Sequence, residues 1–452
     1  METKKGQSRF GKLLSLMENV QGDRVIWMIA LTLVMLSILT ISSSTSLLAL
    51  AGKTTREAII RKHLLVSGVG VGLIVFIYNI RNLKVLETGA KIGVWLSLFL
   101  LIYLNLHIKL PFFRAEYINS AWRTIKVFGS FQLHVYEVVK VAMVMYMAWA
   151  VHAYKEEEKG RKAFWLCHKL KGWFETDFGK KVLYIYAPMG GVFILIVGGS
   201  MSSALFITGI LFVTMLIGGF KGKELALIVL AGIVAIAGVI GIHYASGGRA
   251  FSHVGTALNR IGLSPEEELV DALGTPDFDT VLGRTQQPLG AKLAISEGGF
   301  FGKGPGRSTQ KHVVPVIFAD YMFAFIIEEY GVLGALLVII LYAALLARGS
   351  IVARNCDDDF AKTAIAGLVI LISGQALMHM MVNVGIGPLT GQALPMISDG
   401  KTSFLCFSIA FGIILSISRG ARRKVEQETR ETAPILAAED EVRESLNDLD
   451  QI

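Results

Sequence analysis

Long apolar runs recur along the whole chain, and short polar segments separate them. Crossing the ~30 Å hydrocarbon layer of a bilayer takes about 20 helical residues, and the runs approach or reach that length. They predict about ten membrane-spanning helices, near residues 25–45, 64–81, 87–106, 133–151, 183–199, 201–219, 224–243, 319–347, 362–383 and 402–418. The pattern therefore predicts an all-α fold, a polytopic membrane helix bundle with both termini on one side.

Composition supports this interpretation. Of the 452 residues, 53% are hydrophobic and only 18% are charged, whereas soluble domains have about 25% charged residues. Disordered chains and nucleic-acid-binding globules are excluded, because neither contains so many long apolar runs. The cysteines, Cys167, Cys356 and Cys406, are isolated and odd in number. They indicate neither a disulfide framework nor a zinc site.

The net charge of +8 acts first as a topology signal, because basic loops stay in the cytoplasm. The densest basic connection is 152–182, and a further basic cluster opens the segment 419–452. We therefore expect the N-terminus (1–24), the loop 152–182 and the tail 419–452 to be cytoplasmic. Arg61 and Lys62 then fall on the outer side, against the rule.

Between these cytoplasmic ends lies the membrane domain, residues 25–418. The predicted topology gives it one long extracytoplasmic loop, 244–318. Within this loop, Ser264 and Pro265 followed by acidic residues predict the start of a short helix, because the serine can cap it and proline fits its first position.

A glycine-rich segment, 298–311, precedes the eighth predicted span. Its glycines allow backbone N–H groups to approach an oxyanion, and its cations suit a phosphate. The charged and polar side chains of interest are Lys303, Arg307, Ser308, Gln310 and Lys311. A flexible loop near anionic lipid headgroups is the alternative, and the spacing alone does not favour either.

Asp320 follows this segment at the outer mouth of the span, among apolar residues. A desolvated carboxylate there could act as a general base, but the residue alone slightly favours a helix N-cap, and the two roles are compatible. Glu328 and Glu329 lie about 12–14 Å further along the helix. They are ~100° apart on it, so we expect one to face the bundle interior and the other a polar neighbour, in a functional site or an ion pair.

Glu137 and Lys140 are three residues apart within the 133–151 run. This spacing favours an internal salt bridge; alternatively, Lys140 points into a polar cavity and Glu137 fixes its geometry. His134 and His379 have no second ligand at helical spacing, which makes them poor candidates for a metal site.

A longer motif emerges when the segment around Asp320 is taken as a whole. Its elements, in order, are Gly298-Gly299, Gly302, Gly304, Gly306, Ser308, Gln310-Lys311, Val314-Pro315-Val316, Ala319-Asp320-Tyr321-Met322-Phe323-Ala324 and Glu328-Glu329-Tyr330-Gly331. This order resembles the SEDS family (shape, elongation, division and sporulation), which contains RodA and FtsW. The family pattern is G-G-x-x-G-x-G-x-G-x-S-x-Q-K, then L-P-E, T-D-F-I-F-A and E-E-x-G.

Two other regions are similar to the family. Residues 387–398, which include Pro388 and Pro395, resemble P-x-T-G-x-x-L-P-F-x-S. Arg123, Gly129 and 137–140 resemble R-W-I…G…Q-P-S-E-x-x-K. The Gly391-Gln392 version of the motif and the long basic loop are more similar to FtsW than to RodA, and to FtsW from the Bacteroidota.

The chain also departs from the family pattern at several positions, and these departures affect the residues expected around the site. The departures are Val316 for Glu, His134-Val135-Tyr136 for Gln-Pro-Ser, Ser200 near a family Asp, and Asp399-Gly400-Lys401-Thr402-Ser403 for Y-G-G-S-S. Asp320 and Lys140 are retained.

The resemblance implies a peptidoglycan glycosyltransferase of the bacterial inner membrane, serving cell division or elongation. It would polymerise lipid II, the undecaprenyl-diphosphate-linked disaccharide peptide, with Asp320 as the base. Expected substrate contacts are Lys140, Glu137, Arg249, Arg260, Gln287, Lys303, Arg307, Ser308, Gln310 and Lys311. Expected structural residues are Pro315, Glu328, Glu329, Pro388 and Pro395.

The resemblance further implies a class B penicillin-binding protein, a transpeptidase, as partner, together with other divisome or elongasome membrane proteins. A divalent cation, Mg²⁺ or Mn²⁺, could help to offset the diphosphate charge, although the sequence shows no ligand set. No nucleic acid is expected. Two alternatives use the same features: a lipid II flippase, which needs buried charges for transport, and a non-catalytic scaffold that recruits the transpeptidase.

Overall fold

The computed structural model describes residues 22–44, 55–108, 110–118, 121–128, 131–170, 172–246, 265–275, 278–314, 317–387 and 391–422. The long helices are α2 (Arg24–Ser44), α4 (Arg56–Tyr78), α5 (Leu83–Asn105), α6 (Val135–Glu158), α9 (Ala187–Val197), α10 (Met201–Ile217), α11 (Gly222–Ala245), α14 (Phe278–Gly298), α16 (Met322–Arg354) and α17 (Asp359–Asn383). A last helix spans Lys401–Arg422. Short elements are α7 (Trp165–Leu170), η1 (Gly172–Glu175), α8 (Asp177–Lys181), η2 (Val182–Tyr186), α13 (Pro265–Asp271), η3 (Gln310–His312) and α15 (Ile317–Asp320).

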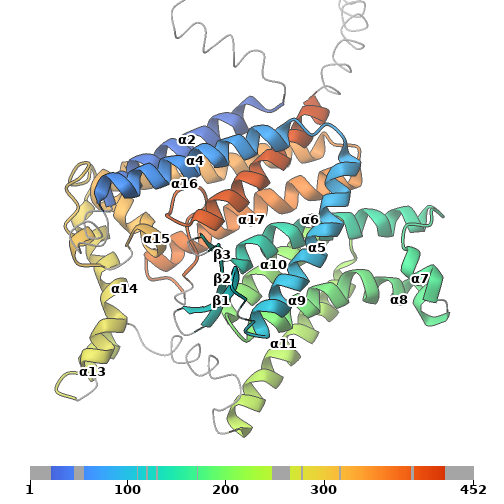
Figure 1. Ribbon diagram of the computed structural model, residues 1–452, viewed down its shortest axis with the longest axis horizontal. Helices are drawn as coiled ribbons and strands as arrows, with labels where there is room; N and C mark the ends of the chain where they lie inside the picture. The colour runs from blue at the N-terminus through green and yellow to red at the C-terminus, as the bar shows by residue number, and fades with distance from the viewer. Residues whose placement is uncertain are drawn as a thin grey trace, which may run out of the picture.

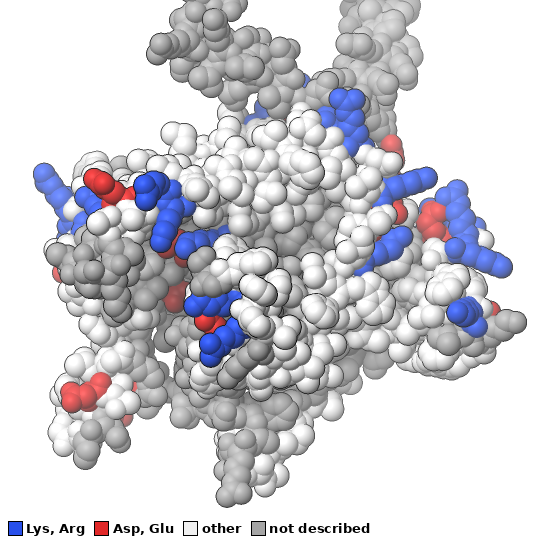
Figure 2. Space-filling model, viewed as in Figure 1, with Lys and Arg blue, Asp and Glu red and all other residues white. Residues whose placement is uncertain are grey.

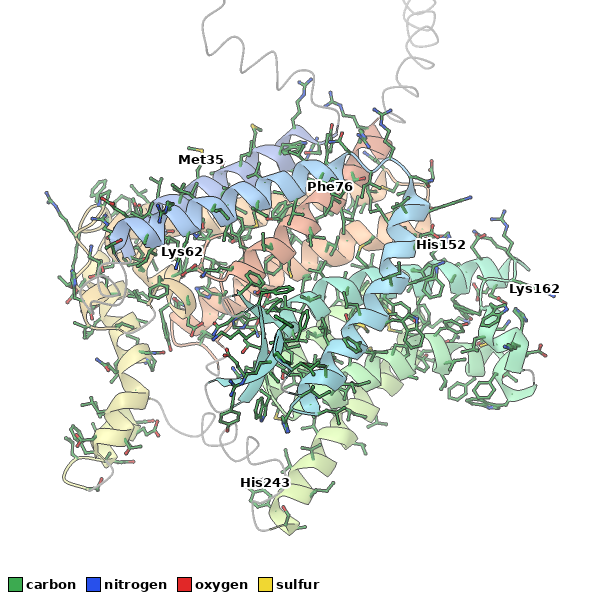
Figure 3. All side chains as sticks on the ribbon, in the orientation of Figure 1. Met35, Lys62, Phe76, His152, Lys162 and His243 are labelled. Carbon is green, nitrogen blue, oxygen red and sulfur yellow. The ribbon has the colours of Figure 1, made fainter. Side chains whose placement is uncertain are left out.

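The predicted polytopic helical bundle is confirmed. Among the described residues, eight helices are long and apolar enough to cross a membrane, and two shorter apolar helices, Met201–Ile217 and Gly232–Ala245, accompany them. Figure 1 shows α2, α4, α16 and α17 lying side by side. Met35 on α2 lies at the edge of the bundle in Figure 3, and 64% of its surface is exposed; Phe76 on α4 is 68% exposed. Such exposed apolar faces fit a lipid surrounding.

The two ends of α2 are fixed to α16 by polar contacts, and the helices run antiparallel. At one end Asp23 accepts a hydrogen bond from Arg348 Nε (2.7 Å). At the other end the Ser43 hydroxyl donates to Glu329 (2.6 Å). The 20 residues from Asp23 to Ser43 rise about 30 Å, which matches the hydrocarbon thickness. The two contacts therefore mark opposite membrane surfaces.

The predicted basic loop lies at the Asp23 end. Lys155, near the end of α6, pairs with Asp359 at the start of α17 (2.6 Å), only a few residues beyond the end of α16. The described chain ends meet here as well, since Arg422 Nη1 donates to the Gly22 carbonyl (2.9 Å). In Figure 2 charged side chains gather at the left and right ends of the molecule and in one further group below the centre, and the rest of the visible surface is mainly uncharged.

Arg61 and Lys62 lie at the opposite end, on the first turns of α4 (Figure 3 labels Lys62). The start of α4 is near the end of α2, because Arg56 Nη2 donates to the Ser42 carbonyl (3.0 Å). These two cations therefore lie at the end of the bundle opposite the basic loop, as the predicted topology requires, and in that topology they remain exceptions to the charge rule.

A small antiparallel sheet joins α5 to α6, and the hydropathy pattern did not predict it. Its strands are β1 (Phe113–Ile118), β2 (Ala121–Val127) and β3 (Phe131–His134), in the order β1-β2-β3. Ala115 opposes Ile125 on a buried face. Arg114 opposes Lys126 on the other face. The last strand ends at His134, which takes the N-cap position of α6.

The loop 244–318 contains more helix than expected. The short helix predicted near Ser264 is α13, which begins at Pro265; Ser264 itself lies outside the described residues. The helix α14 follows and contains Pro288. It packs against α16, and it leads directly into the glycine-rich segment 298–311.

The helix α16 is broken at Gly331, whose backbone (φ 67°, ψ −162°) is not helical. The glycine-rich segment replaces the hydrogen bonds that the break removes. Lys303 N donates to the Glu328 carbonyl (2.9 Å), and Gly304 N to that of Glu329 (2.9 Å). In return, Val332 N donates to the Gly299 carbonyl (3.1 Å). Backbone polar groups near hydrocarbon must be paired, so the segment and the break require each other.

We expect Gly331→Ala to destabilise the protein by about 1–3 kcal/mol, because its left-handed backbone is strained for alanine. In addition, a Cβ atom at Gly331 would lie 2.2 Å from the Phe300 carbonyl oxygen. Gly68→Ala on α4 is the matched control, since a Cβ atom there meets nothing within 4 Å. Thermal unfolding of both variants in one detergent measures the difference, and equal melting temperatures would contradict the role of Gly331.

Candidate functional site

Asp320 ends α15, immediately before α16, and α17 holds its backbone. The Asn383 side chain donates through Nδ2 to the Asp320 carbonyl (3.1 Å). Through Oδ1 it accepts from Ala324 N (3.0 Å), one of the first N–H groups of α16, which lack helical partners. Asn383 therefore fixes both the position of Asp320 and the start of the helix. The predicted N-cap role of Asp320 is wrong, because Tyr321 takes the N-cap position and has no capping side chain.

Asp320 as a whole residue is half-buried. No side chain of the described residues donates a hydrogen bond to its carboxyl group. Desolvation by the surrounding protein raises its pKa, and the Arg123 guanidinium opposes this rise. Arg123 comes from β2, where its Nε donates to the Gly199 carbonyl (3.4 Å). A carboxylate that is held in place and receives no hydrogen bond from a described side chain can accept a proton.

Lys140 is the centre of a second polar cluster. Only 1% of its surface is exposed. Its ammonium donates to Glu137 Oε1 (2.6 Å), Gln375 Oε1 (2.6 Å) and Gln392 Oε1 (2.8 Å). The predicted pair with Glu137 is therefore present, and two amides complete the coordination of the ammonium.

Gln392 connects this cluster to Asp320. The backbone carbonyl of Gln392 accepts a hydrogen bond from His379 Nδ1 (2.7 Å), and His379 Nε2 accepts one from Phe323 N (3.4 Å). These partners assign the proton to Nδ1. His379 is thus a structural link between Lys140 and the start of α16, not a metal ligand.

The sequence contained a signal for this face of α17 that a search for single residues misses. Gln375, His379 and Asn383 are spaced by four, so they lie on one side of the helix, and all three are buried. Three polar residues on one side of an otherwise apolar membrane helix indicate a polar interior.

Two departures from the family pattern join the same region. Ser200 caps α10, and its hydroxyl donates to Ser203 Oγ (2.9 Å), which accepts from Gln392 Nε2 (3.0 Å). His134 N donates to Thr402 Oγ1 (3.2 Å). Desolvation lowers the pKa of the exposed His134 imidazole, the nearby Glu137 raises it, and Lys140 and Arg123 lower it further. We therefore expect neutral imidazole near pH 7.

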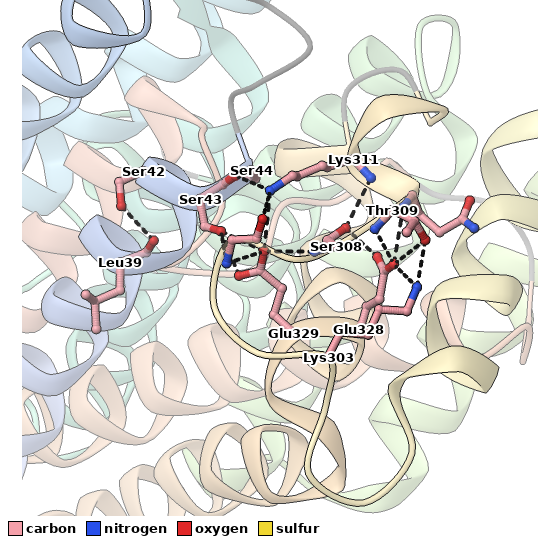
Figure 4. A network of polar contacts seen from close by, with 12 residues as sticks. Leu39, Ser42, Ser43, Ser44, Lys303, Ser308, Thr309, Lys311, Glu328 and Glu329 are labelled. Atoms are coloured by element: carbon pink, nitrogen blue, oxygen red, sulfur yellow. Dashed lines mark hydrogen bonds and ion pairs between the residues drawn. The ribbon is translucent and has the colours of Figure 1, made fainter.

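Glu328 and Glu329 are both fully buried, and both face the glycine-rich segment (Figure 4). Glu328 accepts from Lys303 Nζ (2.8 Å) and Thr309 N (2.7 Å). Glu329 accepts from Ser43 Oγ and from Gly306 N (3.0 Å). The expectation that the two carboxylates face different surroundings is wrong, because one segment wraps around the helix far enough to reach both.

The cations of the segment have different surroundings. Lys303 pairs with Glu328 and also with Glu297. Lys311 is buried, donates to the Gly306 carbonyl (2.6 Å), and lies 3.8 Å from Glu329 Oε1. Arg307, by contrast, is exposed. The segment thus supplies two ammonium groups to two buried carboxylates.

The remaining predicted residues are placed as follows. Ser308 donates to Glu328 through its hydroxyl, and Gln310 N also donates to Glu328 (3.2 Å). Gln287 is half-buried on α14. The Pro395 carbonyl accepts from the Tyr342 hydroxyl. Arg249, Arg260, Pro315, Val316 and Pro388 lie outside the described residues.

No group of three or more His, Cys, Asp or Glu side chains within the described part of the chain is arranged to hold a metal ion. The carboxylates Glu328 and Glu329 already have ammonium and hydroxyl partners. We therefore assign no step to a divalent cation.

Comparison with known proteins identifies relatives over much of the chain. Stage V sporulation protein E of Bacillus subtilis is 24% identical over 363 residues, 80% of this chain and 87% of that protein. The probable peptidoglycan glycosyltransferase FtsW of Trichlorobacter lovleyi is 28% identical, over 68% of this chain and 70% of its own. That of Caulobacter vibrioides is 37% identical, and the match spans 30% of this chain and 35% of that protein.

Solved structures share the fold. A chain of a peptidoglycan synthase complex that coordinates polymerization and crosslinking superimposes with a TM-score of 0.61 at 19% identity, covering 88% of this chain and 98% of that one. The rod shape determining protein RodA of Thermus thermophilus gives 0.54 at 18% identity, covering 89% and 99%.

The family model of the cell cycle proteins FtsW, RodA and SpoVE matches residues 23–423. The match covers the bundle, the glycine-rich segment and Asp320, which confirms the resemblance seen in the motifs. This chain belongs to the FtsW/RodA/SpoVE family of cell cycle proteins.

Proposed function

We propose that this protein is a peptidoglycan glycosyltransferase that joins lipid II units into glycan strands at the outer face of the bacterial inner membrane. The names of its FtsW relatives support this activity. The observation that carries the proposal is Asp320, a half-buried aspartate directly before α16, whose backbone Asn383 holds and whose carboxyl receives no hydrogen bond from a described side chain.

The reaction needs a base at the attacking hydroxyl. The 4-hydroxyl oxygen of one lipid II attacks the anomeric carbon of the growing strand, and the bond from that carbon to the diphosphate oxygen breaks with inversion. Asp320 takes the hydroxyl proton, and undecaprenyl diphosphate leaves with the electron pair. The raised pKa of Asp320 makes it a stronger base than an exposed aspartate.

The leaving diphosphate needs cations that are free to meet it. Arg307 is the exposed cation of the described glycine-rich segment, and we assign it to this contact with Arg249 and Arg260. Lys303 and Lys311 act indirectly, because their ammonium groups already hold the segment to Glu328 and Glu329. Lys140, which pairs with Glu137, fixes Gln392, and Gln392 is linked through His379 to the start of α16.

The orientation follows the charge rule, with the Asp23 end, the basic loop and both termini in the cytoplasm. The end that carries Ser43, Glu329 and Asp320 then faces outward, where lipid II is polymerised. A class B penicillin-binding protein is the expected partner, since the structurally similar synthase complex coordinates polymerization with crosslinking.

Asp320→Asn should lower lipid II polymerisation by roughly 10²–10⁴-fold, because the amide cannot accept the proton. Asp279→Asn is the matched control: it is the same change at an exposed position of α14. Polymer is measured with the purified protein and its transpeptidase partner. Near-normal polymer from a folded Asp320→Asn protein would contradict the role. Lipid II translocation without polymer would favour the flippase, and growth supported by Asp320→Asn alone would favour the scaffold.

The pH dependence of kcat/KM tests the same carboxyl. Its base form is lost as pH falls through the raised pKa, so the acidic limb should lie above ~3.9, the pKa of an ordinary aspartate. Arg123 holds this pKa down, so Arg123→Met should move the limb to higher pH. Lys126 lies on the same strand as Arg123 and pairs with Glu116 of β1. The control variant Lys126→Met should leave the acidic limb in place. A limb unmoved by Arg123→Met would argue against Asp320 as the titrating base.

Variants of Arg307 and Lys311 should distinguish a loss of substrate binding from a loss of stability. Lys311→Met leaves the buried Glu329 without its nearby cation, and we expect a loss of roughly 3–5 kcal/mol of stability. Arg307→Met removes an exposed charge, so KM for lipid II should rise while the melting temperature stays unchanged. The two assignments are wrong if Lys311→Met melts normally or if Arg307→Met has normal kinetics.

A further inference from the structure

Three exposed phenylalanines gather at one end of the sheet β1–β3. Phe112, Phe113 and Phe128 expose 63%, 43% and 72% of their surfaces. The ring of Phe128 lies 6.0 Å from that of Phe112 and 5.8 Å from that of Phe113, between centroids. We call these three residues the aromatic tip. Exposed clusters of large apolar side chains mark contact surfaces.

The backbone pairing of the sheet holds the aromatic tip in position. Phe113 opposes Val127 across β1 and β2, and Phe128 N donates to the Phe112 carbonyl (3.0 Å). Phe128 has a left-handed backbone, φ 48°, which is strained for a residue with a Cβ atom. The strands therefore hold the three rings together at one end of the sheet.

The aromatic tip lies at the level of the outer end of α5. The Tyr103 hydroxyl, two residues before this helix ends, donates to the Phe113 carbonyl. Figure 1 shows the sheet beside the end of α5. Because α5 is one of the candidate membrane spans, Phe113 lies close to the outer surface of the hydrocarbon layer.

The lipid-facing side of α5 continues toward the aromatic tip. Exposed apolar residues follow one another along the helix at helical spacing: Trp95 (73%), Phe99 (62%), Ile102 (48%) and Leu106 (65%). Leu110, between this stripe and the tip, is 52% exposed. The exposed apolar surface thus runs from the middle of a membrane span to the tip.

The broad face of the sheet is different in character. Glu116 on β1 pairs with Lys126 (3.3 Å) and accepts from Gln132 Nε2 (3.1 Å). Arg114 stands opposite Lys126 and is exposed. The sheet therefore has an aromatic end and a polar, partly cationic face, the combination found where proteins sit at a membrane surface.

We propose that the aromatic tip inserts into the outer leaflet, while Arg114 and Lys126 meet the phosphates of lipid headgroups. Lipid is favoured over a protein partner because the tip extends the lipid-facing stripe of α5, and because the chain enters the membrane directly on either side of the sheet. The inference does not depend on the proposed enzymatic activity. It gives the outer face of the bundle a fixed depth in the bilayer.

Spin labels on single cysteines test the depth of the tip. The full chain, with Cys167, Cys356 and Cys406 replaced by alanine, is labelled at Phe128→Cys and placed in vesicles of phosphatidylethanolamine and phosphatidylglycerol. Gln132→Cys on the polar face is the control at headgroup level, which a water-soluble reagent can reach, and Phe99→Cys on α5 is the lipid-exposed control. Relaxation by oxygen, which concentrates in lipid, is compared with relaxation by a water-soluble nickel complex.

The label at Phe128 should behave as the label at Phe99 does, with relaxation dominated by oxygen, while Gln132 responds to nickel. A Phe128 label that responds to nickel as Gln132 does would place the tip in water. One protected from both reagents would place it against protein, a second copy or a partner. Either result overturns the proposal, and neither bears on Asp320, so failure here is distinct from failure of the proposed activity.

Discussion

The structure depends on the compensation of two buried carboxylates, Glu328 and Glu329, inside a membrane protein. Each carboxylate needs cations or hydrogen-bond donors as partners. An unpaired carboxylate in such surroundings loses several kcal/mol of hydration. The glycine-rich segment supplies the compensation with two ammonium groups, several backbone N–H groups and hydroxyls. These donors belong to an irregular segment, so they reach the two carboxylates only if the segment keeps one conformation. The charges of α16 thus determine the shape of the loop.

A second constraint acts on the same helix from the other side. His379 and Asn383 on α17 accept hydrogen bonds from Phe323 N and Ala324 N, the opening N–H groups of α16. Only a few residues separate these contacts from Glu328. The first part of α16 is therefore fixed at its start by α17 and at its break by the glycine-rich segment. Asp320, directly before it, takes its position from both, which suits a reactive group whose geometry matters more than its flexibility.

The sequence predicted what depends on single elements and missed what depends on pairs of them. Apolar runs predicted the spans because each span must satisfy its own backbone. The predicted grouping of the basic loop 152–182 with the N-terminal end of the bundle agrees with the ion pair of Lys155 and Asp359, which lies at the Asp23 end. The surroundings of Glu328 and Glu329 could not be predicted in this way, because they depend on a loop that a helical wheel does not contain. The sheet escaped notice because its strands are short and its buried positions, such as Ala115 and Ile125, are few.

The amphiphilic substrate that we propose would explain why a catalytic carboxyl should lie where Asp320 does. A polyprenyl tail remains in lipid, so its diphosphate and sugars cannot move far from the headgroup level. A base deep in the bundle would never meet them, and one in a mobile outer domain would lack a defined height. Asp320 has a defined height because α16 is tied to α2 by contacts about 30 Å apart, from Asp23 to Ser43. If Asp320 is the base, as we propose, the depth of the outer face in the bilayer decides whether the acceptor hydroxyl reaches the carboxylate. Features that set this depth would then influence catalysis without contacting the substrate.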